Sequence, residues 1–200
     1  MLKYTGYIRK IRYYSESSHY IVALLEVEED QELLTMNGYM SNFNDYDKYA
    51  FYGDFEIHPK YGQQFKLDHY EIVLSTDEEE IIKYLSSPLF KGIGPTQAKY
   101  IVDALGENAL SLIKEDKHHL DLVKGMTVAK RELIYEVLTS NDYDQEVTQF
   151  FMGHGISLRH IGIIQETYKE KTLEILQNHP YQLVEDIDGI GFKTADELAL

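Results

Sequence analysis

The hydrophobic positions of this 200-residue chain follow two different patterns, and the change falls near residue 76. Before that point, turn-forming clusters separate stretches that are rich in β-branched and aromatic residues, a composition that predicts strands. These stretches are YTGYIRKIRYY, HYIVALLEV, ELLTMNGYM, KYAFYGDFEI and QQFKLDHYEIV. Five strands in so short a segment indicate a small closed or nearly closed barrel, with an OB-like barrel as the leading candidate.

After residue 76 the apolar residues recur at helical spacing, and glycines interrupt them at intervals. Thr76 and Glu79 have the spacing of a capping box, which predicts that the first helix begins here. We interpret the acidic run at residues 77–80 as a negatively charged first turn that complements the helix dipole, in preference to a metal or nuclease cluster.

Four segments of the helical region align on a glycine: KGIGPTQAKYIVDAL, KGMTVAKRELIYEVL, HGISLRHIGIIQETY and DGIGFKTADELAL. Their first glycines are 33, 30 and 34 residues apart, and they are Gly92, Gly125, Gly155 and Gly189. An apolar residue follows each of these glycines at the first, third and ninth position. Such self-similarity predicts a repeated unit of two helices joined by a tight turn.

The first and last copies contain two glycines that flank one apolar residue, Gly92-Ile93-Gly94 and Gly189-Ile190-Gly191. Glycine permits positive φ and lets the backbone approach another group closely, while the central apolar residue can anchor the turn in the core. The amides then point outward beside the positive end of the second helix, an arrangement that binds anions and phosphate above all.

The charge of the chain limits how it could hold a polyanion. Net charge is −15 and the pI is near 4.9. Residues 1–75 carry 7 basic and 12 acidic groups, residues 76–150 carry 8 and 14, and residues 151–200 carry 4 and 8. No segment is basic overall, which argues against a broad attractive field and favours local contacts through backbone donors and a few cations.

Other features of the composition point to a soluble cytoplasmic protein. The sequence has no cysteine, which excludes disulfides and thiolate metal sites. No apolar run approaches the roughly 18 to 20 residues that span a bilayer, and the N-terminus lacks a signal-peptide pattern. We therefore expect no membrane contact.

The repeat resembles the helix-hairpin-helix family. The first and last copies match its G-I-G-x-x-x-A pattern, with Ala98 and Ala195 at the packing position. The other two copies depart from the pattern at the second glycine and the alanine, with Thr127 and Arg131 in one and Ser157 and Ile161 in the other. Copies two and three are therefore expected to be packing units.

The predicted fold class is α+β and multidomain. A five-stranded OB-like β barrel at residues 1–75 is followed by an all-α tandem helix-hairpin-helix region. The first helix-hairpin-helix pair is expected at residues 76–140 and the second at residues 141–200, where the chain stops inside a predicted helix.

The whole chain resembles the N-terminal region of RecD-like DNA helicases, through FYGDFEIHPKYGQQF, IIKYLSSPLFKGIGPTQAKYIVDALGENAL and NHPYQLVEDIDGIGFKTADELAL. The resemblance implies an OB-like domain and tandem hairpins ahead of a superfamily 1 motor, which uses ATP to unwind DNA in the 5′-to-3′ direction during repair or recombination. No G-x-x-x-x-G-K-[ST] segment occurs, so the chain is expected to be a non-catalytic N-terminal fragment without a cofactor. ATP and Mg²⁺ would belong to the full-length protein.

The expected partner is DNA, single-stranded or forked, with the helicase core in cis or other repair proteins as further partners. The residues expected to contact DNA lie in the first and last copies of the repeat. They are Lys91, Gly92, Ile93, Gly94, Thr96, Lys99, Gly189, Ile190, Gly191, Lys193 and Thr194.

Three other functions remain as alternatives. A Holliday-junction binder would also join an OB barrel to tandem hairpins, and a protein-interaction module with degenerate hairpins would suit the acidic balance. A base-excision glycosylase would need a catalytic Asp in a G-P-D setting after the hairpin, and the sequence has none.

Histidines and tyrosines complete the candidate residues. The eight histidines show no metal-ligand spacing with acidic partners, so no structural metal is expected, although hairpin carbonyls at Gly92–Gly94 or Gly189–Gly191 could hold a monovalent cation. Six barrel tyrosines could stack on bases, but we favour packing for at least half: Tyr13, Tyr14, Tyr20, Tyr39, Tyr52 and Tyr61. The acidic cluster at residues 26–30 weakens the case for DNA on that face, which could equally contact the motor or another protein.

Overall fold

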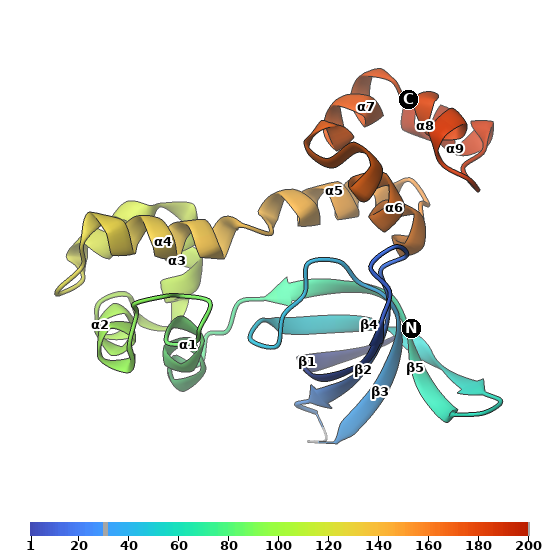
Figure 1. Cartoon of the computed structure of the whole chain (residues 1–200). Coiled ribbons are helices and arrows are strands. Elements are labelled where there is room, and N and C mark those ends of the chain that lie inside the picture. The colour runs from blue at the N-terminus through green and yellow to red at the C-terminus, as the bar shows by residue number, and fades with distance from the viewer. Residues whose placement is uncertain (30–31, 200) are drawn as a thin grey trace. The chain divides into compact units, whose positions relative to one another are not determined.

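The computed structural model describes residues 1–29 and 32–199, so Asp30 of the acidic cluster lies outside the described residues. The chain divides into two compact units. One contains residues 1–43, 50–71 and 144–200, and the other contains residues 44–49 and 72–143. Strands occupy the first part of the chain and helices the remainder, which confirms the predicted fold class (Figure 1).

Within the described residues, five strands form a closed barrel. They are β1 (Leu2–Tyr14), β2 (Tyr20–Val27), β3 (Leu33–Tyr39), β4 (Lys48–His58) and β5 (Gly62–Val73). Their order around the barrel is β1-β2-β3-β5-β4. The neighbours β1 and β2 are antiparallel, as are β2 and β3, whereas β3 and β5 are parallel. The predicted five-stranded barrel is confirmed.

Alternating side chains of the strands fill the barrel. In β2, Ile21, Ala23 and Leu25 are completely buried, while the residues between them point to the outer face. Phe65 of β5 closes the same core. The register of β1 against β2 shifts twice, and such bulges bend a strand and increase its twist, as closure of a small barrel requires.

The second unit consists mainly of the first two repeat copies. Its elements are α1 (Glu78–Leu85), α2 (Pro95–Leu105), η1 (Gly106–Asn108), α3 (Ala109–Glu115), η2 (Lys117–Leu122) and α4 (Val128–Thr139). Ile81, Ile101 and Ile134 are fully buried in its core. Residues 44–49 pack against α1, where the Tyr84 hydroxyl donates a hydrogen bond of 2.7 Å to Asp47.

The first helix begins one residue later than the predicted capping box. Asp77, not Thr76, is the N-cap, and its carboxylate accepts a 2.9 Å hydrogen bond from the Glu80 amide. A carboxylate at this position also interacts favourably with the helix dipole, which explains why it takes the place of the threonine hydroxyl. Residues 78–80 form the acidic first turn that the sequence predicts.

The last two repeat copies form the C-terminal helices. They are α5 (Asp142–Gly153), α6 (Leu158–Tyr168), η3 (Lys169–Lys171), α7 (Thr172–Asn178), α8 (Gln182–Asp186) and α9 (Phe192–Ala199). Their own core includes Phe151, Ile164 and Leu183, which are fully buried. Among the described residues, no helix has the length and apolar composition needed to cross a membrane.

Candidate nucleic-acid interface

Each of the four repeat copies turns at its first glycine with positive φ. The φ angles are 85° at Gly92, 75° at Gly125, 74° at Gly155 and 91° at Gly189. Residues with a Cβ rarely adopt this backbone conformation, so it explains why the same residue recurs at this position. The predicted tight turn is therefore present in all four copies, and a helix follows it in each: α2, α4, α6 and α9.

Three of the four turns share one hydrogen bond. In these turns the residue that follows the glycine donates its amide to the carbonyl of the residue three positions earlier than itself. Ile93 donates to Phe90 at 3.1 Å, and Ile190 donates to Ile187 at 3.3 Å. Positive φ at the third residue of such a turn is typical of type II. The third copy differs, because Ile156 donates to Phe151 and Gly155 to Met152, which is the Schellman pattern at the end of α5.

The second glycine of the pair has a different role from the first. Gly94 is the N-cap of α2 with φ −91° and ψ 175°, an extended conformation open to any residue. A Cβ added to Gly94 or Gly191 would meet nothing within 4 Å. A side chain at either position would therefore not strain the turn, and what the second glycine provides is an N-cap without a side chain.

The side chain at this N-cap separates the four copies into two kinds. Thr127 and Ser157 occupy it in copies two and three, and their hydroxyls accept hydrogen bonds from the amides of Lys130 (3.3 Å) and His160 (3.5 Å). Gly94 makes no such bond. Copies two and three thus cap their own helices internally, whereas copy one does not.

The uncapped end of α2 leaves backbone donors available. Among the described residues, the amides of Gly94, Thr96 and Gln97 have no protein acceptor, and Pro95 has no amide hydrogen. Ile93 is 4% exposed and holds the turn in the core, as expected. Lys91, Thr96 and Lys99 are exposed around the amides. The predicted residues of the first hairpin are therefore exposed around these amides, except Ile93, whose side chain is buried and whose amide donates to the Phe90 carbonyl.

Lys99 is not a free cation. Its ammonium group forms an ion pair of 2.9 Å with Asp103, one helical turn further along α2. The hydrogen bond to Asp103 raises the pKa of Lys99. A phosphate would have to compete with this carboxylate for the lysine.

The last hairpin has the same type of turn but a different charge environment. Ile190 is 5% exposed and anchors the turn, and Lys193 is exposed. Thr194 is half-buried, and its amide already donates to the Gly191 carbonyl at 3.1 Å. Asp188 precedes Gly189, at the position where the first hairpin has Lys91. The electrostatics of the last hairpin are therefore less favourable to phosphate than those of the first.

The hairpins pair within each half of the helical region. Gln97, on the first hairpin, donates from Nε2 to the Lys124 carbonyl of the second at 3.0 Å. His160 holds the equivalent position in the third copy and faces the fourth, since a Cβ on Gly189 would lie 2.8 Å from its Nε2. In both pairs, then, the residue five positions after the first glycine contacts the neighbouring turn.

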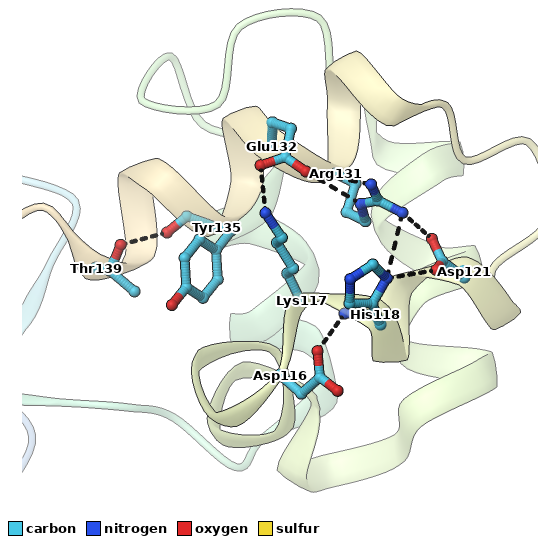
Figure 2. Close-up of polar contacts among 8 residues, drawn as sticks. All are labelled: Asp116, Lys117, His118, Asp121, Arg131, Glu132, Tyr135 and Thr139. Carbon is cyan, nitrogen blue, oxygen red and sulfur yellow. Dashed lines mark hydrogen bonds and ion pairs between the residues drawn. The ribbon is translucent and has the colours of Figure 1, made fainter.

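Arg131, which replaces the packing alanine in the second copy, binds neighbouring acidic groups. Figure 2 shows its guanidinium between Asp121 of η2 and Glu132 of α4, at 2.6 Å and 3.2 Å. Lys117 reaches the other oxygen of Glu132 at 2.8 Å. The small alanine of the first copy is replaced here by an ionic network that joins η2 to α4, in accord with a packing role for copy two.

This network changes the ionisation of its carboxylates. Hydrogen bonds from His118 and then Arg131 lower the pKa of Asp121. A hydrogen bond from Lys117 lowers the pKa of Glu132, and the pairing with Asp121 raises that of Arg131. His118 and His119 thus make contacts of a structural kind, and in the described residues no His, Cys, Asp and Glu side chains gather into a potential metal site.

The six barrel tyrosines differ in their surroundings. Tyr14 donates or accepts a hydrogen bond with the His19 ring, and Tyr52 stacks on His69 with centroids 4.3 Å apart. Tyr20 and Tyr39 pack edge to face at 5.3 Å. Tyr13 and Tyr61 are the exposed ones, at 56% and 64%. Most of the six tyrosines therefore contact neighbouring rings of the protein.

One charged segment was missed because the charge balance was taken over wide windows. Residues 1–15 contain Lys3, Arg9, Lys10 and Arg12 and no acidic residue. The expectation that no segment is basic overall is therefore wrong for β1. A shorter window along the sequence would have found it.

An OB-like barrel, followed by paired hairpins whose turns expose backbone amides, defines a class of nucleic-acid-binding module. Residues 1–75 match the family model described as ATP-dependent DNA helicase YrrC, OB-fold domain, and residues 140–200 match that described as ATP-dependent RecD2 DNA helicase HHH domain. The two matches together cover more than half of the chain. The chain carries the OB-fold and helix-hairpin-helix domains of the N-terminal region of RecD-like ATP-dependent DNA helicases.

Proposed function

We propose that this chain is the non-catalytic, DNA-binding N-terminal part of a RecD-like helicase that works 5′ to 3′ in DNA repair or recombination. Its hairpin amides bind phosphates of single-stranded or forked DNA. The ATP and Mg²⁺ of such a helicase would bind its motor, because these 200 residues contain no G-x-x-x-x-G-K-[ST] segment.

The observation that carries the proposal is the uncapped N-terminus of α2. Gly94 supplies no side-chain acceptor, so the amides of Gly94, Thr96 and Gln97 are open to an external anion. The amide and dipole charges at a helix N-terminus attract phosphate there. Copies two and three also turn at a glycine with positive φ, but a Thr or Ser hydroxyl already accepts a hydrogen bond at the helix N-terminus.

This arrangement also reconciles DNA binding with an acidic chain. At net charge −15, long-range attraction cannot supply the affinity. Short-range hydrogen bonds from fixed amides remain strong at contact, and Lys91 adds one nearby cation. We therefore assign the first hairpin the larger share of phosphate binding and the last hairpin, with Asp188 beside it, the smaller.

Fluorescence anisotropy on a forked oligonucleotide tests the proposal with Gly94→Val. The variant should bind more weakly by roughly 1–3 kcal/mol, the cost of losing charge-assisted hydrogen bonds. It should also stay folded, because its backbone is extended and its Cβ meets nothing within 4 Å. Gly153→Val is the matched control, since its added Cβ is equally unobstructed but lies within α5.

The salt dependence gives a second readout. Lys99→Ala should weaken binding uniformly across sequences and reduce the salt slope by about one. If Gly94→Val is folded by circular dichroism and binds the fork as the parent does, the hairpin is a packing element and the phosphate assignment fails.

A junction-binding function is favoured by one observation, the side-by-side contact of hairpins within each pair through Gln97 and His160. Comparing a four-way junction with a fork and a single strand in the same assay separates the two functions. Preference for the junction supports the alternative. Loss of all DNA affinity at low salt would instead support a protein-interaction module.

A further inference from the structure

The N-terminal strand of the barrel is the most basic part of this acidic protein. Four of its residues are Lys or Arg, and the first acidic residue of the chain is Glu16. In the second half of the strand, residues 9–13 are all exposed. A positively charged, exposed strand is unusual in a chain whose net charge is −15.

The two bulges of β1 determine how these side chains are presented. The register passes from Ile8 to Lys10 and from Ile11 to Tyr13, so Arg9 and Arg12 are the residues that it skips. Lys10 pairs with Leu24 and Tyr13 with Val22, and both partners point to the outer face of β2. Lys10 and Tyr13 therefore lie on the same outer face, with Arg12 between them.

The cations on this strand are not equivalent. Arg9 forms an ion pair with Glu26 and lies over the Tyr7 ring. Lys10 and Arg12 have no ion pair or hydrogen bond to a side chain among the described residues. Two cations, separated by one residue in the sequence, thus remain available to an external anion.

A row of tyrosine rings continues from these cations across the same face. Tyr13 lies next to Tyr20, with ring centroids 6.3 Å apart, and Tyr20 next to Tyr39 at 5.3 Å. Tyr20 and Tyr39 are directly opposite each other in the β2–β3 register. Tyr13 is 56% exposed, so one face of the row is open to solvent beside the two cations.

Two acidic residues near this face, Glu26 and Glu56, already have partners. Glu26 is paired with Arg9, and Glu56 accepts a 3.0 Å hydrogen bond from Asn37 and pairs with Lys66 at 3.5 Å. Burial, Tyr39 and Glu56, in that order, raise the pKa of Tyr20, so this ring stays a neutral stacking surface at physiological pH. Within the described part of the chain, neither of these two carboxylates forms an ion pair with Lys10 or Arg12.

We propose that the outer face formed by β1, β2 and β3 binds single-stranded DNA. Lys10 and Arg12 contact two backbone phosphates, and Tyr13 stacks on an unpaired base. The strands that form this face are labelled in Figure 1. This site is separate from the hairpin amides, which recognise phosphate alone and give no base contact. Alternating phosphate and base contacts fit a single strand, because the bases of a duplex are already stacked on one another.

The charge contribution is tested with Lys10→Ala/Arg12→Ala and fluorescein-labelled oligodeoxythymidylate. Affinity should fall, and the slope of log affinity against log salt should decrease by about 1.4, since each single-strand phosphate contributes about 0.7. Lys83→Ala/Lys171→Ala is the matched control, because both lysines are exposed and unpaired in the described residues and lie outside the barrel. The control should bind as the parent does.

The stacking contribution is tested with Tyr13→Trp, which introduces the only tryptophan of the chain. Oligodeoxythymidylate should quench this tryptophan saturably, and adding Lys10→Ala/Arg12→Ala should move the midpoint to higher DNA concentration. Tyr13→Ala should weaken binding between about fivefold and a hundredfold. The signal is local to β1, so it reports on the barrel whether or not the hairpins bind phosphate.

Two results would overturn the proposal. One is an unchanged tryptophan emission while anisotropy shows that the oligonucleotide is bound. The other is equal affinity of the parent and Lys10→Ala/Arg12→Ala, which would leave this face to a protein partner.

Discussion

At the residue scale, the two glycines of a G-x-G turn have different physical duties. Gly92 supplies a left-handed backbone angle, 85°, and Gly94 supplies an N-cap without a side chain. The first duty concerns folding and recurs in all four copies. The second leaves amides unpaired, which costs helix stability and creates the anion site that we propose, so it is expected only where function requires it.

This division predicts opposite effects of alanine at the two positions. Gly92→Ala should destabilise the protein by roughly 1–2 kcal/mol, because a Cβ is disfavoured at positive φ. Gly94→Ala should change stability little, because its backbone is extended and its surroundings are open. Urea unfolding followed by circular dichroism measures both. Equal losses at the two positions would contradict the assignment of roles.

The Lys99–Asp103 pair gives a second prediction at this scale. Asp103→Asn removes the carboxylate that binds Lys99 at 2.9 Å, so the lysine becomes available to DNA. We expect tighter binding to forked DNA and a steeper salt dependence, both abolished when Lys99→Ala is added. Anisotropy titrations at several salt concentrations measure the change. Weaker binding by Asp103→Asn would show that Lys99 plays no part in DNA contact.

At the element scale, the second hairpin holds its helices together with charge where the first uses a small side chain. Ala98 is fully buried between the helices of copy one, whereas Arg131 of copy two extends to Asp121 and Glu132 (Figure 2). The arginine side chain is larger than the alanine that packs at the equivalent position of copy one. It extends to η2, where Asp121 is its acidic partner. This ion pair joins η2 to α4 within copy two.

The network predicts a defined response to acid. The pKa of Asp121 lies below its ordinary value, so the charged form stabilises the fold above the unfolded pKa, near 3.8, and this contribution is lost as pH falls through the lowered folded value. Arg131→Met should raise the pKa of Asp121 towards 3.8. A carboxyl NMR titration measures it. An unchanged Asp121 pKa in the variant would mean that the ion pair does not form in solution.

The elements themselves were largely predictable, and their ends less so. Strand composition and the glycine repeat predicted the barrel and four hairpins because both depend on local chemistry. The helix start at Asp77 was missed by one residue, since Thr76 and Asp77 are both good caps and the sequence does not decide between them. The Arg131 network was not predictable, because Asp121 is ten residues away and meets it only through the packing of η2 on α4.

At the scale of the whole molecule, an acidic chain carries two kinds of surface suited to DNA. One kind is the uncapped helix end, which needs no net positive charge, and the other is a single basic strand. The uncapped helix end was predicted from the spacing of the glycines, but the different roles of the two glycines were not predicted. The second was missed because a 75-residue window averages Lys10 and Arg12 with the acidic residues that follow them.

The most direct test of the account places a carboxylate where the phosphate is proposed to bind. In Gly94→Asp/Gly191→Asp, the new side chains can cap the helices as Thr127 and Ser157 do in the other copies. The protein should be as stable as the parent or more so, and should lose most of its affinity for forked DNA, with Gly94→Asp the more damaging single change.

The matched control is Thr127→Asp/Ser157→Asp, which adds the same charge at two N-caps that already have side-chain acceptors. Anisotropy of forked DNA with the parent and the two double variants is the deciding measurement. The account predicts that the control binds nearly as the parent does while the glycine variant does not. Equal loss in both double variants would mean that net charge alone governs binding, and equal retention would mean that the hairpins do not bind phosphate.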